Sequence, residues 1–300
     1  MKGGVPGFQL LPLSALASLI GMLVFITVMG WWRFAGTRVI AGRELPCPNR
    51  WTFSSGICTA AIIATTTLAY TFNGVSIVFM MLLMRGGVLA IAPVVDFFSK
   101  RRVRWFSWIA LALSFGALLV AFFGGTKSSL ALSTIAGIDV LIYLASYFVR
   151  LRFMSRLAKS DDPDATKRYF VEEQMTATPI VVLLLGVLAW VGQGELLLQL
   201  RAGFTQMWTS EYLIHILVIG VLSQGTGVFG GLILLGRQEN SFCVPVNRAS
   251  SILAGVLASA SLYLFLDKSP PGIRELFGAL MVVSAILVLS LPPLLQKRRA

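Results

Sequence analysis

Two arginines lie within long apolar segments of this sequence, and they are the residues best suited to chemistry. Arg85 interrupts the apolar stretch 76–98, and Arg248 occupies a similar place in 241–266. An ionisable side chain in a hydrocarbon core is costly, so its presence indicates a functional site. A guanidinium can hold a carboxylate or phosphate through two parallel hydrogen bonds, which predicts an anionic ligand group. The alternative, open for at least one of them, is that the arginine pairs with a carboxylate or helix carbonyls and braces the bundle.

One carboxylate, Asp139, is also expected well inside an apolar segment, 131–149. A polar stripe runs along this segment at helical spacing, formed by Asp139, Tyr143, Ser146 or Tyr147, and Arg150. In a bundle such a stripe faces protein or water rather than lipid. As a functional residue, Asp139 would contact a substrate or carry a coupling proton. The alternative, which the sequence favours, is that Asp139 is the counter-ion of Arg85, because both are expected at a similar depth.

Uncharged polar residues occupy corresponding places in the segments that precede the two arginine segments. Thr66 and Asn73 precede Arg85, whereas Gln224, within the run 223–227, precedes Arg248. These side chains are candidates for substrate contacts, and the glycines beside Gln224 would loosen their helix as in the broken helices of transporters. Alternatively, the small residues only permit close helix packing. The predicted substrate-binding set is Arg85, Arg248, Asp139, Tyr143, Thr66, Asn73, Gln224 and Asn247.

The remaining ionisable residues favour structural roles. Glu172 and Glu173 are expected as solvated carboxylates at a membrane edge, with gating as the alternative. Asp96 is expected to form an interfacial pair with Lys100 and Arg101. No cluster of histidine, cysteine and acidic residues has metal-ligand spacing, and no Ser/His/Asp constellation is expected at membrane depth. The sequence therefore predicts no catalytic residue, no metal and no cofactor, and we do not expect an enzyme.

The elements that position these residues are membrane spans. The chain has 300 residues, of which 56% are hydrophobic and only 13% charged, with a mean hydropathy of +0.81. This composition is typical of a polytopic membrane protein. Spans of about 20 residues are predicted at 10–32, 51–72, 76–98, 105–123, 131–149, 170–192, 212–236, 241–266 and 275–292. In the loop 193–211 one helical face would be apolar, formed by Leu197, Leu200, Phe204, Met207 and Trp208. This loop is either a short amphipathic helix on the outer interface or an apolar loop.

The distribution of basic residues predicts how the spans are oriented. Of the 25 lysines and arginines, 18 fall in alternate connections and in the C-terminal tail. The connections rich in basic residues are 33–50, 99–104, 150–169 and 237–240. Because basic loops stay in the cytoplasm, the C-terminus is expected inside the cell and, with nine spans, the N-terminus outside. The net charge of +12 is thus an orientation signal and not the footprint of a nucleic-acid partner.

The two arginine spans are expected to run in opposite directions. At 1.5 Å per residue, Arg85 lies about 14 Å below the outer surface, and Arg248 lies about 12 Å above the inner one. Equivalent residues at mirrored depths indicate an inverted repeat about an axis in the membrane plane. Secondary transporters are often built in this way, with the substrate site near the midplane.

The order of the elements resembles the drug/metabolite transporter superfamily. Segments 51–123 and 212–296 each show a span, a short turn, an arginine- or proline-marked span, a charged turn and a glycine-bearing span. This pattern is similar to the two halves of the EamA-like branch. The segment MLLMRGGVLAIAPVVDF is similar to a helix of nucleotide-sugar transporter relatives. The resemblance implies ten helices in two inverted sets of five around a central cavity.

The chain departs from that pattern in its first half, which supplies four spans and lacks the opening helix. Either the chain is a nine-helix variant or the true start codon lies upstream. A missing helix would also remove one wall of the cavity that the resemblance implies.

We therefore expect an all-α, polytopic inner-membrane protein made of two repeats, 1–124 and 125–300, with a cytoplasmic C-terminus. The expected function is secondary transport of a small organic metabolite, anionic or zwitterionic rather than cationic, by alternating access. The alternative is a non-transporting membrane subunit or a component of a lipid-linked sugar flippase. The expected partners are a small-molecule substrate and membrane lipids, with a homodimer left open; no nucleic acid is expected.

Overall fold

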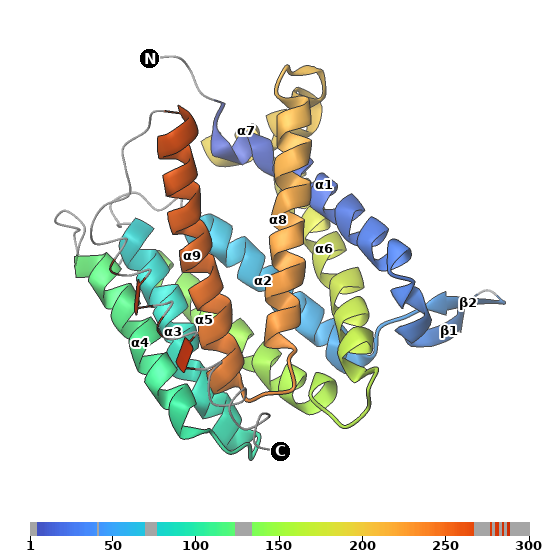
Figure 1. Cartoon of the computed structure of the whole chain (residues 1–300). Coiled ribbons are helices and arrows are strands. Elements are labelled where there is room, and N and C mark those ends of the chain that lie inside the picture. Colours follow the sequence, from blue (N-terminus) through green and yellow to red (C-terminus); the bar gives the residue numbers. More distant parts are fainter. Residues whose placement is uncertain are drawn as a thin grey trace. The chain divides into compact units, whose positions relative to one another are not determined.

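A computed structural model of the chain describes residues 5–40, 42–69, 77–123 and 134–266, together with the single positions 277, 280, 281, 284, 287 and 288 (Figure 1). In this part of the chain the α-helices are α1 (Gly7–Val28), α2 (Arg50–Ala69), α3 (Ile77–Phe98), α4 (Trp105–Phe123), α5 (Thr134–Phe153), α6 (Ala165–Val191), α7 (Glu195–Thr205), α8 (Leu213–Leu234) and α9 (Asn240–Leu266). Short 3-10 turns, η1 (Trp31–Phe34) and η3 (Met207–Thr209), and a π-helical turn, η2 (Met154–Ala158), complete the helical elements.

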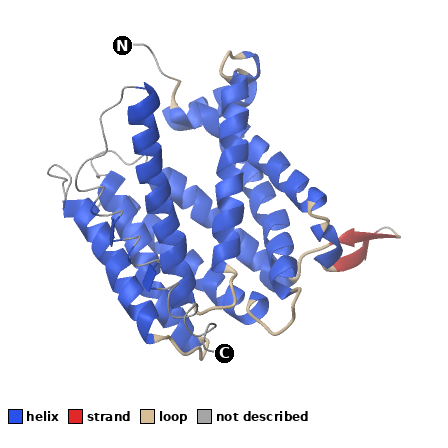
Figure 2. Cartoon of the chain, in the orientation of Figure 1, coloured by secondary structure: helices blue, strands red, loops and turns tan. Residues whose placement is uncertain are grey.

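The expectation of a helical protein is confirmed (Figure 2). Among the described residues, five helices are long and apolar enough to cross a membrane by length and composition: α1, α2, α5 with its continuation to Ala158, α6 and α8. These helices are compatible with a multi-pass membrane protein. Helices lie at eight of the nine predicted span positions, and the ninth, 275–292, falls largely outside the described residues.

A small β-hairpin stands in the basic connection 33–50, which the sequence had not indicated. Strands β1 (Thr37–Ile40) and β2 (Arg43–Pro46) pair antiparallel, with Ile40 opposite Arg43 at the closed end. Gly42 has a φ of +77°, a left-handed conformation that glycine adopts without a steric penalty. The β-branched residues of β1 favour an extended backbone, so a four-residue strand forms once the turn is set.

The chain divides into two compact units that interleave along the sequence. Unit 1 comprises Met1–Ala64 and Asp161–Leu232, and unit 2 comprises Thr65–Ser160 and Ile233–Ala300. Each unit thus takes segments from both predicted repeats, 1–124 and 125–300. A compact unit is defined by contacts, whereas a repeat is defined by equivalence along the chain, so the two repeats stay a prediction.

In unit 1, α1 packs against α6 and α7, and glycines let the helices approach closely. A methyl group on Gly220 of α8 would overlap the backbone of Ser14 and the side chain of Ala17 in α1. At this crossing the Ser18 hydroxyl donates a hydrogen bond of 2.8 Å to the Gly220 carbonyl. Small residues at helix crossings permit this close packing in membrane proteins.

The predicted short helix in 193–211 is confirmed as α7, followed by η3. Two residues of its expected apolar face, Leu200 and Met207, are buried, whereas Trp208 is 51% exposed. Arg201 of α7 donates hydrogen bonds to the carbonyls of Ala189 and Trp190, at 3.0 and 2.6 Å. These carbonyls belong to the last turn of α6, where the helix has no partners of its own for them.

In unit 2, α3 is the central helix and packs against α4, α5 and α9. Its side chains Val88, Leu89, Ala92 and Val95 are fully buried. A cluster around Phe106 and Ala110 joins α4 to α9 through Leu113, Phe242 and Val246. This packing holds α5 and α9, which carry half of the predicted polar site, against one common helix.

Candidate functional site

The predicted residues Arg248 and Tyr143 meet in unit 2. The Arg248 Nη2 atom of α9 donates a hydrogen bond of 3.4 Å to the hydroxyl of Tyr143 in α5. The guanidinium also lies 5.2 Å from the ring centroid of Tyr147, one helical turn further along α5. An arginine over an aromatic face is attracted by the negative charge of the ring. Two tyrosines of one helix therefore hold the guanidinium of another.

The two tyrosines form a buried aromatic pair. Tyr143 and Tyr147 are 3% and 7% exposed, and their ring centroids lie 4.9 Å apart. Their i, i+4 spacing places both on the same face of α5. Their partner Arg248 still has a buried Nε atom without a hydrogen-bond partner. One donor of the guanidinium is thus left over.

Asp139 lies one turn before Tyr143 on the same face of α5, and it is 3% exposed. Both of its carboxylate oxygens are buried without a hydrogen-bond partner. The expected ion pair of Asp139 with Arg85 is therefore wrong in this structure. Arg85 of α3 lies in the neighbourhood of Tyr143 instead. Similar depth in two helices does not make two side chains face each other, because the rotation of each helix is set by its packing.

The other predicted site residues are spread over both units. Asn247 is half-buried in α9, beside Arg248, and Thr66 is half-buried in the part of α2 that belongs to unit 2. Gln224 is half-buried in α8 and belongs to unit 1. Asn73 lies outside the described residues. The structure thus brings together Asp139, Tyr143 and Arg248, with Arg85 in the neighbourhood of Tyr143.

Asp96 has a role that the sequence analysis missed. It is fully buried near the end of α3, where its carboxylate accepts hydrogen bonds from the backbone amides of Asn240 and Ser241 at the start of α9. The side chains of Asn240 and Ser241 also donate to it, at 2.8 and 2.7 Å. The expected interfacial pair with Lys100 and Arg101 is therefore wrong. Asp96 instead caps the N-terminus of α9, whose first amides have no partner within the helix.

A buried lysine strengthens the same end of unit 2. The Lys159 ammonium donates to the Gln238 carbonyl at 2.9 Å and to the Asn240 side-chain oxygen at 3.0 Å, and its third donor contacts the Cys243 sulfur at 3.6 Å. Burial lowers the pKa of Lys159. Arg101 also donates to the Lys159 carbonyl, at 2.8 Å. These contacts tie the connection before α9 to the end of α5.

Glu239 forms an ion pair with Arg104 in unit 2. Its Oε1 atom accepts hydrogen bonds from Arg104 at 2.8 Å and from Ser107 at 2.7 Å. Burial alone would raise the pKa of Glu239, but the hydrogen bonds from Arg104 and Ser107 outweigh burial and hold the pKa below its ordinary value. Charge and hydrogen bonding thus keep this carboxylate ionised.

Glu172 caps a helix in unit 1 in the same manner. It is 3% exposed in α6 and accepts hydrogen bonds from the backbone amides of Gly36 and Asn49 and from the Thr52 hydroxyl, at 3.0, 3.1 and 2.6 Å. Asn49 and Thr52 lie at the start of α2. The expectation of a solvated carboxylate at the membrane edge is therefore wrong for Glu172.

The neighbouring Glu173 is fully buried and is equally removed from solvent. It accepts hydrogen bonds from Ser55 and Thr59 of α2, at 2.7 and 3.0 Å, and the Ser55 hydroxyl also contacts that of Tyr169. The expectation of solvation is wrong here too. Glu172 and Glu173 together fasten α6 to α2 along more than one turn.

The sequence holds no specific signal for these caps. Neither α2 nor α9 has an acidic residue in its first turn, although both begin with polar residues that suit an N-terminus. The same lack of an acidic residue is found in α1, α3, α4, α5, α6 and α8, so it does not single out the helices that are capped from elsewhere. Tertiary packing decides which carboxylate caps each helix.

Comparison with known proteins shows the fold and no family. No family model matches the chain, and no curated protein matches it. Twenty chains of solved structures match it. One of them, described as "Crystal structure of protein", has a TM-score of 0.56 at 14% identity, and the match covers 96% of this chain and 88% of that one. At this identity the likeness shows a shared fold and carries no information on activity.

Proposed function

We propose that the chain is a secondary transporter of a small organic solute that bears a carboxylate or phosphate group. The proposed binding site is centred on Arg248, Tyr143 and Asp139 in unit 2, with Arg85 and Asn247 beside it. Thr66 and Asn73 stay as proposed further contacts from the preceding span, whereas Gln224, in unit 1, stays a prediction from the sequence alone. The energy would come from the solute gradient, from exchange or from protons.

The observation that carries this proposal is a pair of unsatisfied buried groups of opposite charge. The Nε atom of Arg248 and both carboxylate oxygens of Asp139 are buried without a hydrogen-bond partner. Folded proteins satisfy nearly all buried polar groups, so a group left over demands an explanation. The helices α5 and α9 that carry these groups both pack against α3. A bound polar solute would supply the missing partners.

The spacing of the two groups favours a zwitterion. Tyr143, which contacts Arg248, stands four residues after Asp139, which is about 6 Å along the helix. A solute with a carboxylate at Arg248 and an ammonium group at Asp139 would satisfy both. A purely anionic solute would instead require Asp139 to be protonated, and proton uptake would then accompany binding.

The membrane arrangement is proposed together with the function. Five described helices have the length and composition of spans, and helices also occupy the other predicted positions up to residue 266. We propose nine spans in two inverted repeats, 1–124 and 125–300, in the inner membrane with the C-terminus in the cytoplasm. The drug/metabolite transporter resemblance supports this arrangement, and alternating access is what such a symmetry serves.

A binding screen with two variants tests the solute class. The full chain in detergent is heated with panels of zwitterionic, anionic and cationic metabolites, and the shift in the unfolding temperature is measured. A solute that binds only the folded state stabilises it by RT ln(1 + L/Kd), where L is the free solute concentration, so the shift grows with solute concentration and with affinity. We expect stabilisation by zwitterions, lost in both Arg248→Gln and Asp139→Asn but kept in Ser261→Ala. Ser261 is exposed on the same helix, α9, and its hydroxyl bonds only to the Leu257 carbonyl.

The outcomes separate the alternatives. Stabilisation by anions that survives in Asp139→Asn and disappears in Arg248→Gln would point to the anionic class. Stabilisation by cations that survives in Arg248→Gln would contradict the proposed site. Stabilisation that is the same in all variants would place the solute elsewhere.

A further inference from the structure

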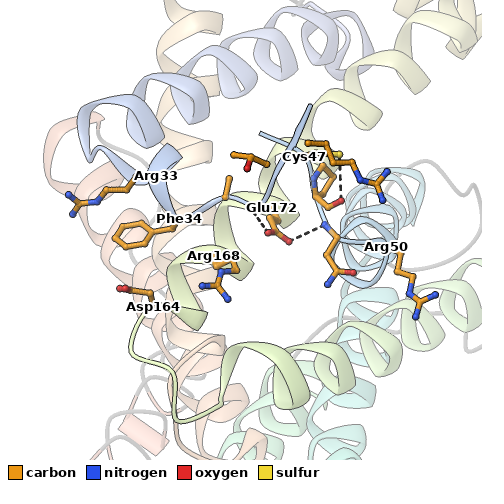
Figure 3. Close-up of a pocket in the computed structure, with 13 residues that line it drawn as sticks. Arg33, Phe34, Cys47, Arg50, Asp164, Arg168 and Glu172 are labelled. Atoms are coloured by element: carbon orange, nitrogen blue, oxygen red, sulfur yellow. Dashed lines mark hydrogen bonds between the residues drawn. The ribbon is translucent and has the colours of Figure 1, made fainter. Parts of the chain in front are cut away.

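A wide cavity in unit 1 is rich in arginine (Figure 3). Its volume is about 1030 Å³, and we name it the arginine basin. Its wall is formed by η1, the hairpin strand β1, the start of α2 and the start of α6. The lining includes four arginines and two carboxylates: Arg33, Arg38, Arg50, Arg168, Asp164 and Glu172.

The two carboxylates of the arginine basin are already engaged. Glu172 accepts three hydrogen bonds from the chain around the start of α2. Asp164 accepts a hydrogen bond from Lys167 at 3.1 Å. Among the described residues, neither carboxylate forms an ion pair with an arginine of the basin. The carboxylates that line the basin therefore do not neutralise the positive charge of its arginines.

Three of the four arginines have no salt bridge among the described residues. Arg168 lies 3.4 Å from Asp162, in a pair exposed on both sides. Arg33 and Arg50 stack on the adjacent aromatic rings of Phe34 and Trp51, at 4.8 and 4.9 Å from the centroids. Stacking leaves the in-plane donors of a guanidinium free for a ligand. Figure 3 shows Arg33 and Arg50 on opposite sides of the open space, with Arg168 between them.

The hairpin whose residues Thr37 and Arg38 line the arginine basin also carries exposed apolar side chains. On the hairpin, Val39 is 71% exposed and Leu45 is 44% exposed. Leu45 stands directly opposite Arg38 in the antiparallel register. Exposed apolar side chains beside a basic cluster are suited to the boundary between lipid headgroups and acyl chains. Basic clusters next to the cytoplasmic end of a span bind anionic lipids.

We propose that the arginine basin binds a phosphate group at the membrane surface, supplied by the headgroup of an anionic phospholipid. Arginine is the side chain best suited to phosphate, because its planar fork donates two parallel hydrogen bonds. The headgroup would lie in the arginine basin, where the positive charges of Arg33, Arg38 and Arg50 act on it from the walls. An acyl chain would run along Leu45, which shares one face of the hairpin with Arg38. The lipid source rests on the membrane placement proposed above, whereas the phosphate chemistry rests on the basin alone.

The experiment measures lipid binding to the full chain by native mass spectrometry. The protein in neutral detergent is titrated with phosphatidylglycerol and, separately, with phosphatidylcholine. Losing one of Arg33, Arg38 or Arg50 to Gln should weaken phosphatidylglycerol binding about fivefold, and losing all three about a hundredfold. The matched control removes three exposed basic residues outside the basin, Arg43→Gln with Lys100→Gln and Arg156→Gln. We expect this control to bind within about twofold of the wild type.

A second arm distinguishes the sources of phosphate. Inorganic phosphate is added to the protein before the lipid titration. Weak competition at millimolar phosphate, with strong phosphatidylglycerol binding, supports the lipid headgroup. Tight binding of inorganic phosphate that the three arginine variants weaken supports the phosphate site and overturns its lipid source.

Equal loss of binding in the triple variant and in its control would overturn the basin as a site, because net charge alone would then explain it. Equal binding of phosphatidylcholine and phosphatidylglycerol would do the same. The single variants keep the test decisive if the triple variant does not fold. Arg33, Arg38 and Arg50 lie outside unit 2, so their loss should leave solute binding at Arg248 and Asp139 intact. Either proposal can therefore be refuted without the other.

Discussion

Asp96 accepts two hydrogen bonds from Ser241, one from its backbone amide and one from its hydroxyl, each 2.7 Å long. The two residues are 145 positions apart in the chain. The contact joins the end of α3 to the start of α9, which are the two helices that carry Arg85 and Arg248. The proposed solute site is thus held at one end by a buried carboxylate that has no role in binding.

Replacing Asp96 with Asn should destabilise unit 2. The variant keeps the volume of the side chain but loses the charge that four donors share, and hydrogen bonds to a charged group contribute about 1.5–3 kcal/mol each. Because an amide still accepts some of these bonds, we expect a loss of about 3 kcal/mol in the free energy of unfolding. Urea unfolding in detergent micelles measures it. Asp161→Asn, at an exposed site, is the control, and an equal effect in both variants would contradict the capping role.

The ion pair of Glu239 with Arg104 should make stability depend on pH. The folded pKa of Glu239 lies below its ordinary value, so the carboxylate contributes its full stability above about pH 4.5 and loses it as the pH falls through the folded pKa. The Glu239→Gln variant has no such group. The difference in unfolding free energy between wild type and variant should therefore be largest near about pH 6 and shrink toward about pH 3. A difference that is constant with pH would refute this assignment.

The helix crossing at Gly220 predicts a position-specific effect of a single methyl group. Gly220→Ala would force the new Cβ into Ser14 and Ala17 of α1, and overpacking of this kind costs about 1–3 kcal/mol. Gly227 lies in the same helix with no atom near its missing Cβ. Gly227→Ala should thus be neutral or stabilising by up to about 1 kcal/mol, because alanine favours the helix. Thermal unfolding of both variants tests this prediction, because the unfolding temperature should fall in Gly220→Ala and should not fall in Gly227→Ala.

The proposed orientation is open to chemical labelling. Single cysteines are placed at Arg43, in the exposed hairpin, and at Glu195, at the start of α7, after the three native cysteines are replaced. A membrane-impermeant thiol reagent added to intact cells should label the cysteine at 195 and spare the one at 43. Labelling of both in intact cells would refute the positive-inside assignment for this half of the chain.

The helices could be predicted from the sequence because the spans are long apolar runs that end at loops of different composition. The expected segment 105–123 and the helix α4 agree residue for residue, and the ends of α3 agree within one residue. The amphipathic spacing of Leu200 and Met207 likewise predicted α7. These features are local, since a period of 3.6 residues and a hydropathy average depend only on neighbours along the chain.

The buried polar contacts could not be predicted in the same way. Asp96 and Glu172 stand at helix ends, where a carboxylate in solvent and a carboxylate capping a distant helix have the same local sequence. Their partners are 144 and 123 residues away, so only the fold shows which role applies. The sequence placed Asp139 correctly on a stripe with Tyr143. Whether the Asp139 side chain faces Arg85, however, depends on how α3 and α5 pack.

The most direct test of the transport function is solute flux through the purified chain in liposomes. Protein-containing liposomes are loaded with the unlabelled solute that stabilises the protein, and uptake of the same solute in radiolabelled form is followed. The account predicts transient accumulation of the label, at least tenfold slower in Arg248→Gln, since losing a contact to a charged group costs about 1.5–3 kcal/mol. Ser261→Ala should match the wild type. A solute that binds and depends on Arg248 but shows no flux above that of protein-free liposomes would contradict transport and leave a membrane subunit that only senses the solute.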